Sequence, residues 1–204
     1  MKKKKIRWMR KFVCLLLSLF AVAAVSCAKE RITGNGEIVK LEKSVAPFNS
    51  FKISGSGTIK VHKSEESKVV INVDSNLATY ITVKSRNKKL DIKTEPHQYT
   101  KLMIDIYTPN VNTFRTTGSS AISFAGNVFD SVKPLRIEIN GSGKFDSAAF
   151  PVETAEINIT GSGSVNTWCN EKLTVKVTGA GEIYYKGDPM ISKSIFGSAK
   201  IEKL

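Results

Sequence analysis

We predict that most of this chain forms an all-β solenoid, in which short strands stack in successive turns, for three reasons. A Gly-x-Gly-like tripeptide recurs seven times, and all but one of the intervals between copies are 18–23 residues long. Apolar residues hold the same offsets around these glycines. Between the glycines, apolar and polar residues alternate with the period of two that is typical of strands with one buried face.

The first 26 residues are predicted to be a signal peptide. Seven basic residues lie between Lys2 and Lys11, and an uncharged run of 14 residues follows from Phe12 to Val25. This run is shorter than the ~20 residues of a membrane span and is typical of the apolar core of a secretory signal. Small residues precede Cys27, so the segment resembles a lipobox, in which the cysteine becomes the acylated first residue. The alternative is an ordinary secretory signal that is cut nearby.

Cys27 is therefore the expected lipidation site, and a membrane is the expected partner through its acyl chains. The whole chain carries 31 basic and 18 acidic residues, and the signal holds seven of the basic ones, so the mature net charge is 24 − 18 = +6. We find no basic stripe interleaved with aromatic residues and expect no nucleic-acid partner. With Cys14 removed and Cys27 acylated, Cys169 stands alone and no internal disulfide is expected.

The repeated glycines are predicted to be structural turns, because glycine adopts φ > 0 without a steric penalty. The interval of 63 residues between Gly55 and Gly118 is three times 21, which would fit two repeats whose glycines were replaced. The glycines assigned to turns are Gly34, Gly36, Gly55, Gly57, Gly118, Gly141, Gly143, Gly161, Gly163, Gly179, Gly181 and Gly197.

Each repeat is interpreted as turn, strand, turn, strand. Stacking such units ~4.8 Å apart would pair every strand with its neighbours and place equivalent residues in columns. We expect Gly141, Gly161 and Gly179 in one column. The expected buried columns beside it are Ile139, Ile159, Val177 and Ile195, and Phe145, Val165, Ile183 and Ile201.

The expected organisation is a signal peptide at 1–26, a lipidated N-terminus with a first turn or linker at 27–47, and a solenoid at 48–204. The region 68–108 is less regular, and Arg86 to Lys89 is typical of a hairpin turn. The N-terminal half is therefore expected to be partly antiparallel or a looser solenoid. An antiparallel sandwich is the competing fold, but it does not explain why apolar residues keep the same offsets around each copy of the glycine turn.

No catalytic, metal or cofactor site is expected, so the chain is not predicted to be an enzyme. The glycine loops precede strands and lack the helix N-terminus that a phosphate loop needs. His62 and His97 are expected at the surface, without a zinc-ligand pattern, and Cys169 is expected to be packed rather than nucleophilic. Two further groups are weak candidates for a glycan site, namely the carboxylates Asp105, Asp130 and Glu138, and the aromatics Trp168, Tyr184 and Tyr185.

A resemblance adds to this interpretation. Three ordered segments carry it: Phe48–Gly55, Leu102–Pro109 and Tyr185–Ile201, together with the Gly-Ser-Gly copies at 55–57, 141–143 and 161–163. They resemble the putative auto-transporter adhesin, head GIN domain family of exported Bacteroidetes proteins. The resemblance implies a single-stranded, right-handed parallel β-helix with Gly-Ser-Gly turns.

The family's role in cell adhesion then implies a non-enzymatic lipoprotein of the cell envelope, in the outer membrane. It would present a rigid β-helix to a surface glycan or protein ligand, with a homo-oligomer as a further expectation. The alternative function is a polysaccharide-binding or polysaccharide-cleaving β-helix protein.

Overall fold

The computed structural model describes residues 31–126 and 134–204, and residues 32–204 form one compact unit. Most of the described residues lie in strands and the one described helix is a short 3-10 helix, which confirms the all-β prediction. The predicted signal peptide, Cys27 and Asp130 lie outside the described residues. In chain order the elements are β1 (Ile38–Ser44), β2 (Ser50–Lys63), β3 (Lys68–Asp74), the 3-10 helix η1 (Ser75–Tyr80), β4 (Ile81–Arg86), β5 (Lys89–Thr94), β6 (Leu102–Thr108), β7 (Thr113–Ala125), β8 (Leu135–Gly141), β9 (Lys144–Gly161), β10 (Ser164–Gly179), β11 (Glu182–Lys186), β12 (Met190–Gly197) and β13 (Lys200–Lys203).

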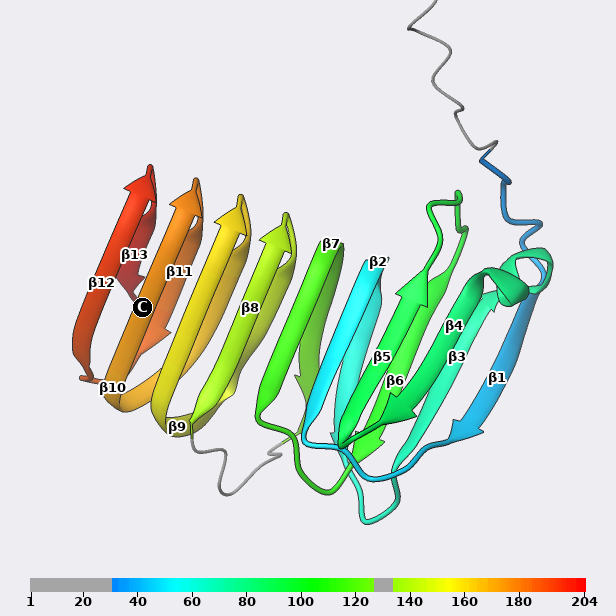
Figure 1. Cartoon of the computed structure of the whole chain (residues 1–204), viewed down its shortest axis with the longest axis horizontal. Coiled ribbons are helices and arrows are strands. Elements are labelled where there is room, and N and C mark those ends of the chain that lie inside the picture. The colour runs from blue at the N-terminus through cyan, green and yellow to red at the C-terminus, as the bar shows by residue number, and fades with distance from the viewer. Residues whose placement is uncertain (1–30, 127–133) are drawn as a thin grey trace, which may run out of the picture. The chain divides into compact units, whose positions relative to one another are not determined.

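The described strands belong to one mixed sheet, and its N-terminal half is partly antiparallel, which is one of the two arrangements expected there. Its main path runs β1-β3-β6-β2-β7-β8-β9-β10-β11-β13, with β4, β5 and β12 attached beside it. The pairs β1–β3, β3–β6 and β4–β5 are antiparallel, whereas the pairs from β2 and β7 onward are parallel. Figure 1 shows the parallel strands β7 to β12 side by side.

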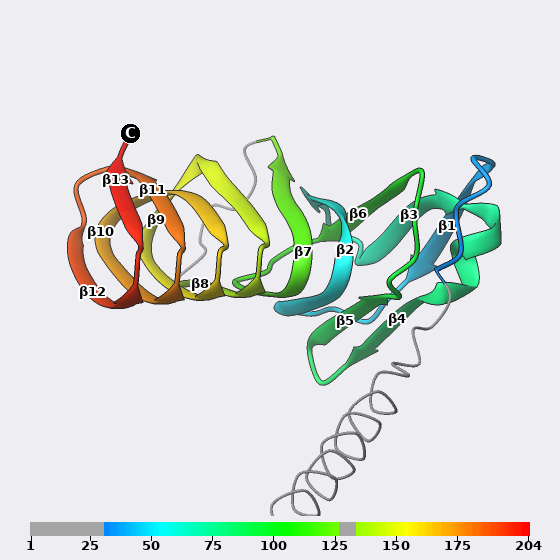
Figure 2. The same cartoon turned by 90° about the horizontal axis from the view of Figure 1, so that it is seen from above.

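The parallel region is wound, so that the chain passes repeatedly from one row of strands to the other (Figure 2). One such pass is called a coil below. β9 and β10 are long because each continues through both rows, with register shifts near Trp168 where β10 bends. Alternation of apolar and polar residues along each strand turns one set of side chains inward, and the parallel register then stacks these sets.

Three columns of stacked side chains fill the interior. Their members are largely β-branched or aromatic, which suits a pleated, buried surface. At the last coil, Ile195 and Ile201 are only half-buried because no further coil covers them. The columns are Leu90, Phe51, Phe114, Ile137, Ile157 and Val175; Ile92, Ile53, Thr116, Ile139, Ile159, Val177 and Ile195; and Ile104, Ile59, Ile122, Phe145, Val165, Ile183 and Ile201.

The interval of 63 residues holds one extra coil and an antiparallel excursion, which corrects the expectation of two hidden repeats. β5 and β6 together pair in parallel with the two halves of β2, on the side opposite β7. β4 and β5 form the expected hairpin, with Asn87 (φ 51°) and Lys88 (φ 58°) at its tip. Two residues with positive φ match the twist of an antiparallel pair, so this turn sets the direction of β5.

The segment 32–47, which was expected to be a first turn or linker, belongs to the folded unit. β1 pairs with β3 along its whole length. Gly34 and Gly36 lie outside the glycine series and pack near Asp74, whose buried carboxylate accepts a hydrogen bond from the Gly36 N–H at 2.9 Å. A Cβ on Gly34 would lie 2.4 Å from that carboxylate. These two glycines therefore allow the chain before β1 to pack against Asp74 at the N-terminal edge of the sheet.

Candidate functional site

The first glycines of six repeats lie one above another along one edge of the wound region. Gly55, Gly118, Gly141, Gly161, Gly179 and Gly197 are in register, with φ between 115° and 125°. From Gly118 onward, a Cβ would lie 2.2–2.6 Å from the carbonyl oxygen of the preceding glycine. The column therefore needs glycine both for backbone conformation and for space.

The second glycines have a different role from the one expected. Gly143, Gly163 and Gly181 do not have positive φ. A Cβ on Gly163 would lie 2.6 Å from Cγ2 of Ile139, and one on Gly143 would lie 2.8 Å from Cγ2 of Thr116. These residues are small because interior side chains occupy the space beside them. Gly57 has φ 142° and faces Leu102.

Two rows of small polar side chains flank the glycine column, and together they are called the polar edge. Nearly all members are exposed, and none carries a charge. Strand spacing sets their repeat at ~4.8 Å. The polar edge consists of Ser54, Thr117, Asn140, Thr160 and Thr178 on one side of the column, and Ser56, Ser119, Ser142, Ser162 and Ser198 on the other. Ala180 interrupts the second row between Ser162 and Ser198, and the exposed Phe196 follows Thr178 in the first row.

A shallow hollow of about 530 Å³ adjoins the polar edge, and no pattern in the sequence pointed to it. The loop between β5 and β6 supplies Gln98 and Tyr99, while β2 and β7 supply hydroxyl and small side chains. Hydroxyls, an amide and an aromatic ring are groups that can orient a polar ligand. The lining residues are Ser56, Gly57, Thr58, His97, Gln98, Tyr99, Leu102, Ser119 and Ala121.

Two of the acidic residues singled out in the sequence, Asp105 and Glu138, contact different basic partners. Asp105 on β6 lies 2.8 Å from Nε2 of His62, whose ring stacks on Tyr107. Glu138 on β8 forms an ion pair with Arg115 at 2.7 Å. Among residues 31–126 and 134–204, no group of three or more His, Cys, Asp and Glu side chains is placed to hold a metal ion.

His97 is buried, which corrects its expected surface position. Its side chain is 2% exposed, packs edge-on against Tyr80, and accepts a hydrogen bond from the Ile32 N–H at Nδ1. The chain before β1 covers this ring, and no local pattern around His97 indicates that contact. His97 therefore helps to hold Ile32 against the folded unit.

Cys169 is a free, fully buried thiol. It donates to the carbonyl oxygens of Glu153 and Lys172, and burial raises the pKa of the thiol. A thiol that stays protonated at neutral pH is a poor nucleophile, so packing is the role of Cys169.

The three aromatics do not form one stacking surface. Trp168 is 36% exposed and donates from Nε1 to Asn170. Tyr184 has the ammonium group of Lys200 5.3 Å from its ring centre, and Tyr185 packs against the core.

Comparisons with known proteins identify relatives of this architecture. The family model described as putative auto-transporter adhesin, head GIN domain, matches residues 47–131 and 128–189. A solved structure of a putative adhesin from Bacteroides fragilis is 18% identical, with a TM-score of 0.53, and the match covers 85% of this chain and all of that one. A search of curated proteins found no match.

Two structures from Parabacteroides distasonis also match over 86% of this chain and the whole of theirs. One is described as a putative adhesin, at 18% identity and a TM-score of 0.40, and the other as a putative lipid binding protein, at 22% and 0.42. At these identities a likeness bears on the fold alone. In the part of the chain that the structure describes, no helix has the length and apolar character to cross a membrane.

Proposed function

The chain belongs to the putative auto-transporter adhesin, head GIN domain family, and on this basis we propose that it is a non-enzymatic adhesin of the cell envelope. The observation that carries the proposal is the polar edge with its adjoining hollow. It is a regular, uncharged and exposed surface on a tightly packed body. Asp105 and Glu138, the described carboxylates that were considered for a glycan-cleaving site, pair with His62 and Arg115, respectively.

The body that presents this surface is a single-stranded, right-handed parallel β-helix over residues 113–126 and 134–203. The in-register parallel pairing and the glycine column support this part of the proposal. Each coil contacts only its neighbours, as in other solenoids, so the polar edge is held at a constant spacing. A rigid array loses little conformational entropy when it binds a ligand.

The ligand is a surface glycan or protein that is complementary to hydroxyl and amide groups. We expect a purified chain of residues 28–204 to bind target cells or immobilised glycans. The double variant Ser119→Lys and Thr160→Lys, which places two charges on the polar edge, should lose this binding. The control is Ala149→Lys with Ser192→Lys, which adds the same charge at exposed positions far along their strands from the polar edge.

Equal binding by both double variants would exclude the polar edge as the adhesive surface. A polysaccharide-cleaving protein is the alternative function, and it is tested with the same material. Release of reducing ends from any glycan by residues 28–204 would contradict the non-enzymatic proposal.

Attachment to the outer membrane is proposed through acyl chains on Cys27, on the sequence pattern that precedes this residue. Two or more acyl chains give stable anchoring. Cys27→Ala should release the protein from the membrane fraction, and mass spectrometry of the wild type should find the acyl chains. The lipid anchor would be refuted if the variant stayed in the membrane fraction and the wild type carried no acyl chains.

A further inference from the structure

One outer sheet face, where β4, β5 and the first half of β2 lie side by side, carries a concentration of positive charge. Its five basic residues, called the basic face, are Lys52, Lys84, Arg86, Lys89 and Lys93.

The register explains how these residues meet. Arg86 lies opposite Lys89, and Lys84 and Lys52 lie on either side of Asp91. The intervening residues of β5 point inward and are buried, so the five basic side chains share the outer face and are all exposed. Asp91 is the single acidic residue in these rows, which leaves a local excess of four positive charges.

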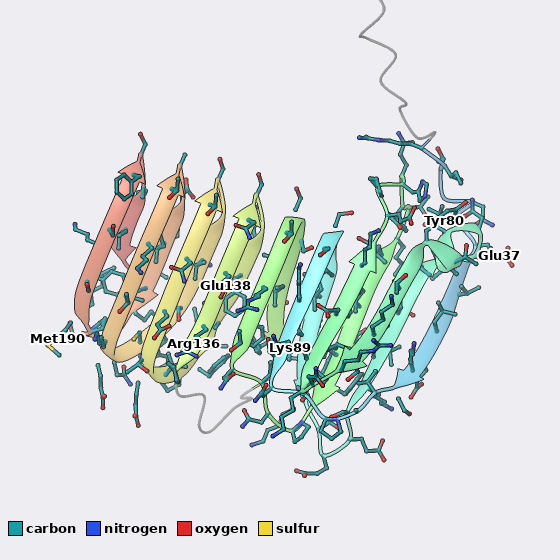
Figure 3. All side chains as sticks on the ribbon, in the orientation of Figure 1. Glu37, Tyr80, Lys89, Arg136, Glu138 and Met190 are labelled. Atoms are coloured by element: carbon teal, nitrogen blue, oxygen red, sulfur yellow. The ribbon has the colours of Figure 1, made fainter. Side chains whose placement is uncertain are left out.

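The basic face is uncompensated, in contrast to the next strands of the same sheet. There Arg115 pairs with Glu138 at 2.7 Å, and Arg136 pairs with Glu156 at 3.0 Å. Figure 3 shows Arg136 and Glu138 on this neighbouring region and Lys89 at the basic face. Within the described residues none of the five basic side chains forms an ion pair. Like charges opposite one another destabilise a sheet, so this cluster is a cost to the fold that an anionic partner would relieve.

The chain enters the folded unit next to β5. Thr33 pairs with Gln98, and the Ile32 N–H donates to His97, both in the loop that follows β5. Ile32 is five positions after Cys27 in the sequence, a span of at most roughly 18 Å in a fully extended chain. An acylated Cys27 would therefore keep this end of the unit close to the bilayer surface.

We propose that the basic face binds the anionic headgroups of phospholipids in the membrane that holds the anchor. This inference rests on the proposed lipidation for its cellular setting, but the binding chemistry is a property of the folded unit alone. A basic residue near an anionic bilayer strengthens binding about fivefold, and the attraction is screened by salt. Acyl chains and a basic surface are two signals that act together in membrane attachment.

The test uses unacylated mature protein, residues 28–204, because residues 32–204 contain the entire described core. Sedimentation with vesicles should show binding to phosphatidylcholine mixed with phosphatidylglycerol, little binding to phosphatidylcholine alone, and release at high sodium chloride. The triple variant Lys84→Glu, Lys89→Glu and Lys93→Glu should bind the anionic vesicles at least about a hundredfold more weakly, since three contributions of about fivefold are lost and three repulsive charges are added.

The matched control reverses Lys144, Lys172 and Lys176, three exposed lysines on later coils, and should retain most of the binding. A second variant, with glutamine at Lys84, Lys89 and Lys93, repeats the test without new acidic charges and is checked for folding by circular dichroism. Equal losses in the two reversed triples would overturn the proposal. So would equal binding to both vesicle types, or binding to a soluble sulfated polysaccharide without binding to vesicles. None of these results depends on acylation, which the Cys27→Ala fractionation tests separately.

Discussion

Replacing Gly161 with alanine tests the physical basis of the glycine column. Gly161 has φ +117°, a conformation that side chains disfavour at a cost of about 1–3 kcal/mol. The added Cβ would also lie 2.6 Å from the carbonyl oxygen of Gly141 and 3.2 Å from its Cα. These are backbone atoms held in the ladder, so relief must separate adjacent coils, and overpacking of this kind costs about 1–3 kcal/mol.

The separation would also weaken the hydrogen bond from the Ser162 N–H to the Gly141 carbonyl, 3.0 Å long, which contributes about 0.5–1.5 kcal/mol. The three effects together predict a loss of about 2.5–7.5 kcal/mol in the free energy of unfolding. Urea unfolding of residues 28–204, followed by Trp168 fluorescence and circular dichroism, should show a midpoint lower by about 1–4 M if the m-value is about 2 kcal/mol/M.

Two control substitutions separate conformation from contact. Gly36 has φ +78°, and no surrounding atom lies within 4 Å of the position that an alanine Cβ would take, so Gly36→Ala should cost only about 1–2 kcal/mol of backbone strain. Gly163 lacks positive φ but its Cβ would meet Cγ2 of Ile139 at 2.6 Å, so Gly163→Ala tests contact with a side chain that can shift. If Gly161→Ala loses no more stability than Gly36→Ala, close stacking of the column is not what requires glycine.

Three further predictions concern the core, the N-terminal edge and the last coil. Ile159→Ala should lower the free energy of unfolding by about 2–5 kcal/mol because it leaves a cavity in the core. Ile201→Ala should lower it by less, because Ile201 is only half-buried. The urea midpoints of the two variants measure both effects. Hydrogen bonding from Thr100 holds the pKa of Asp74 below its ordinary value of 3.8. The ionised Asp74 carboxylate therefore stabilises the fold above pH 3.8, and this stabilisation is lost as the pH falls through the lowered pKa. The difference in Tm between wild type and Asp74→Asn should therefore shrink on acidification from pH 6 to pH ~3; a constant difference would contradict it. Lys193 is in register with Val175, at the position of an interior column in the last coil. Because inward charges deter edge pairing, Lys193→Val should promote self-association, measured by analytical ultracentrifugation. A variant that stays monomeric would refute the proposal that Lys193 prevents self-association.

Local patterns in the sequence predicted most of the strands of the parallel region and their buried faces, but not β1. Alternation along a segment such as 156–160 determines which side chains point inward, because a one-residue slip would expose the whole apolar set. Recurrent glycines at constant offsets from those apolar residues also predict that equivalent positions stack. The hairpin at Asn87 and Lys88 was likewise predicted from local composition, since a two-residue turn is a local structure.

Only the tertiary structure decided which strands are neighbours. β2 lies between the β5–β6 coil and β7, although β5 and β6 follow it in the chain, and nothing in an alternating pattern specifies such a partner. The burial of His97 beneath Ile32 and the contact of Gly34 with Asp74 depend on pairings across 65 and 40 residues, respectively. The same is true of the basic face, because Lys52 joins Lys84 and Lys93 only through the β2–β5–β4 register. Periodicity determines the direction of each side chain, whereas strand pairing between distant segments depends on the packing of the whole core.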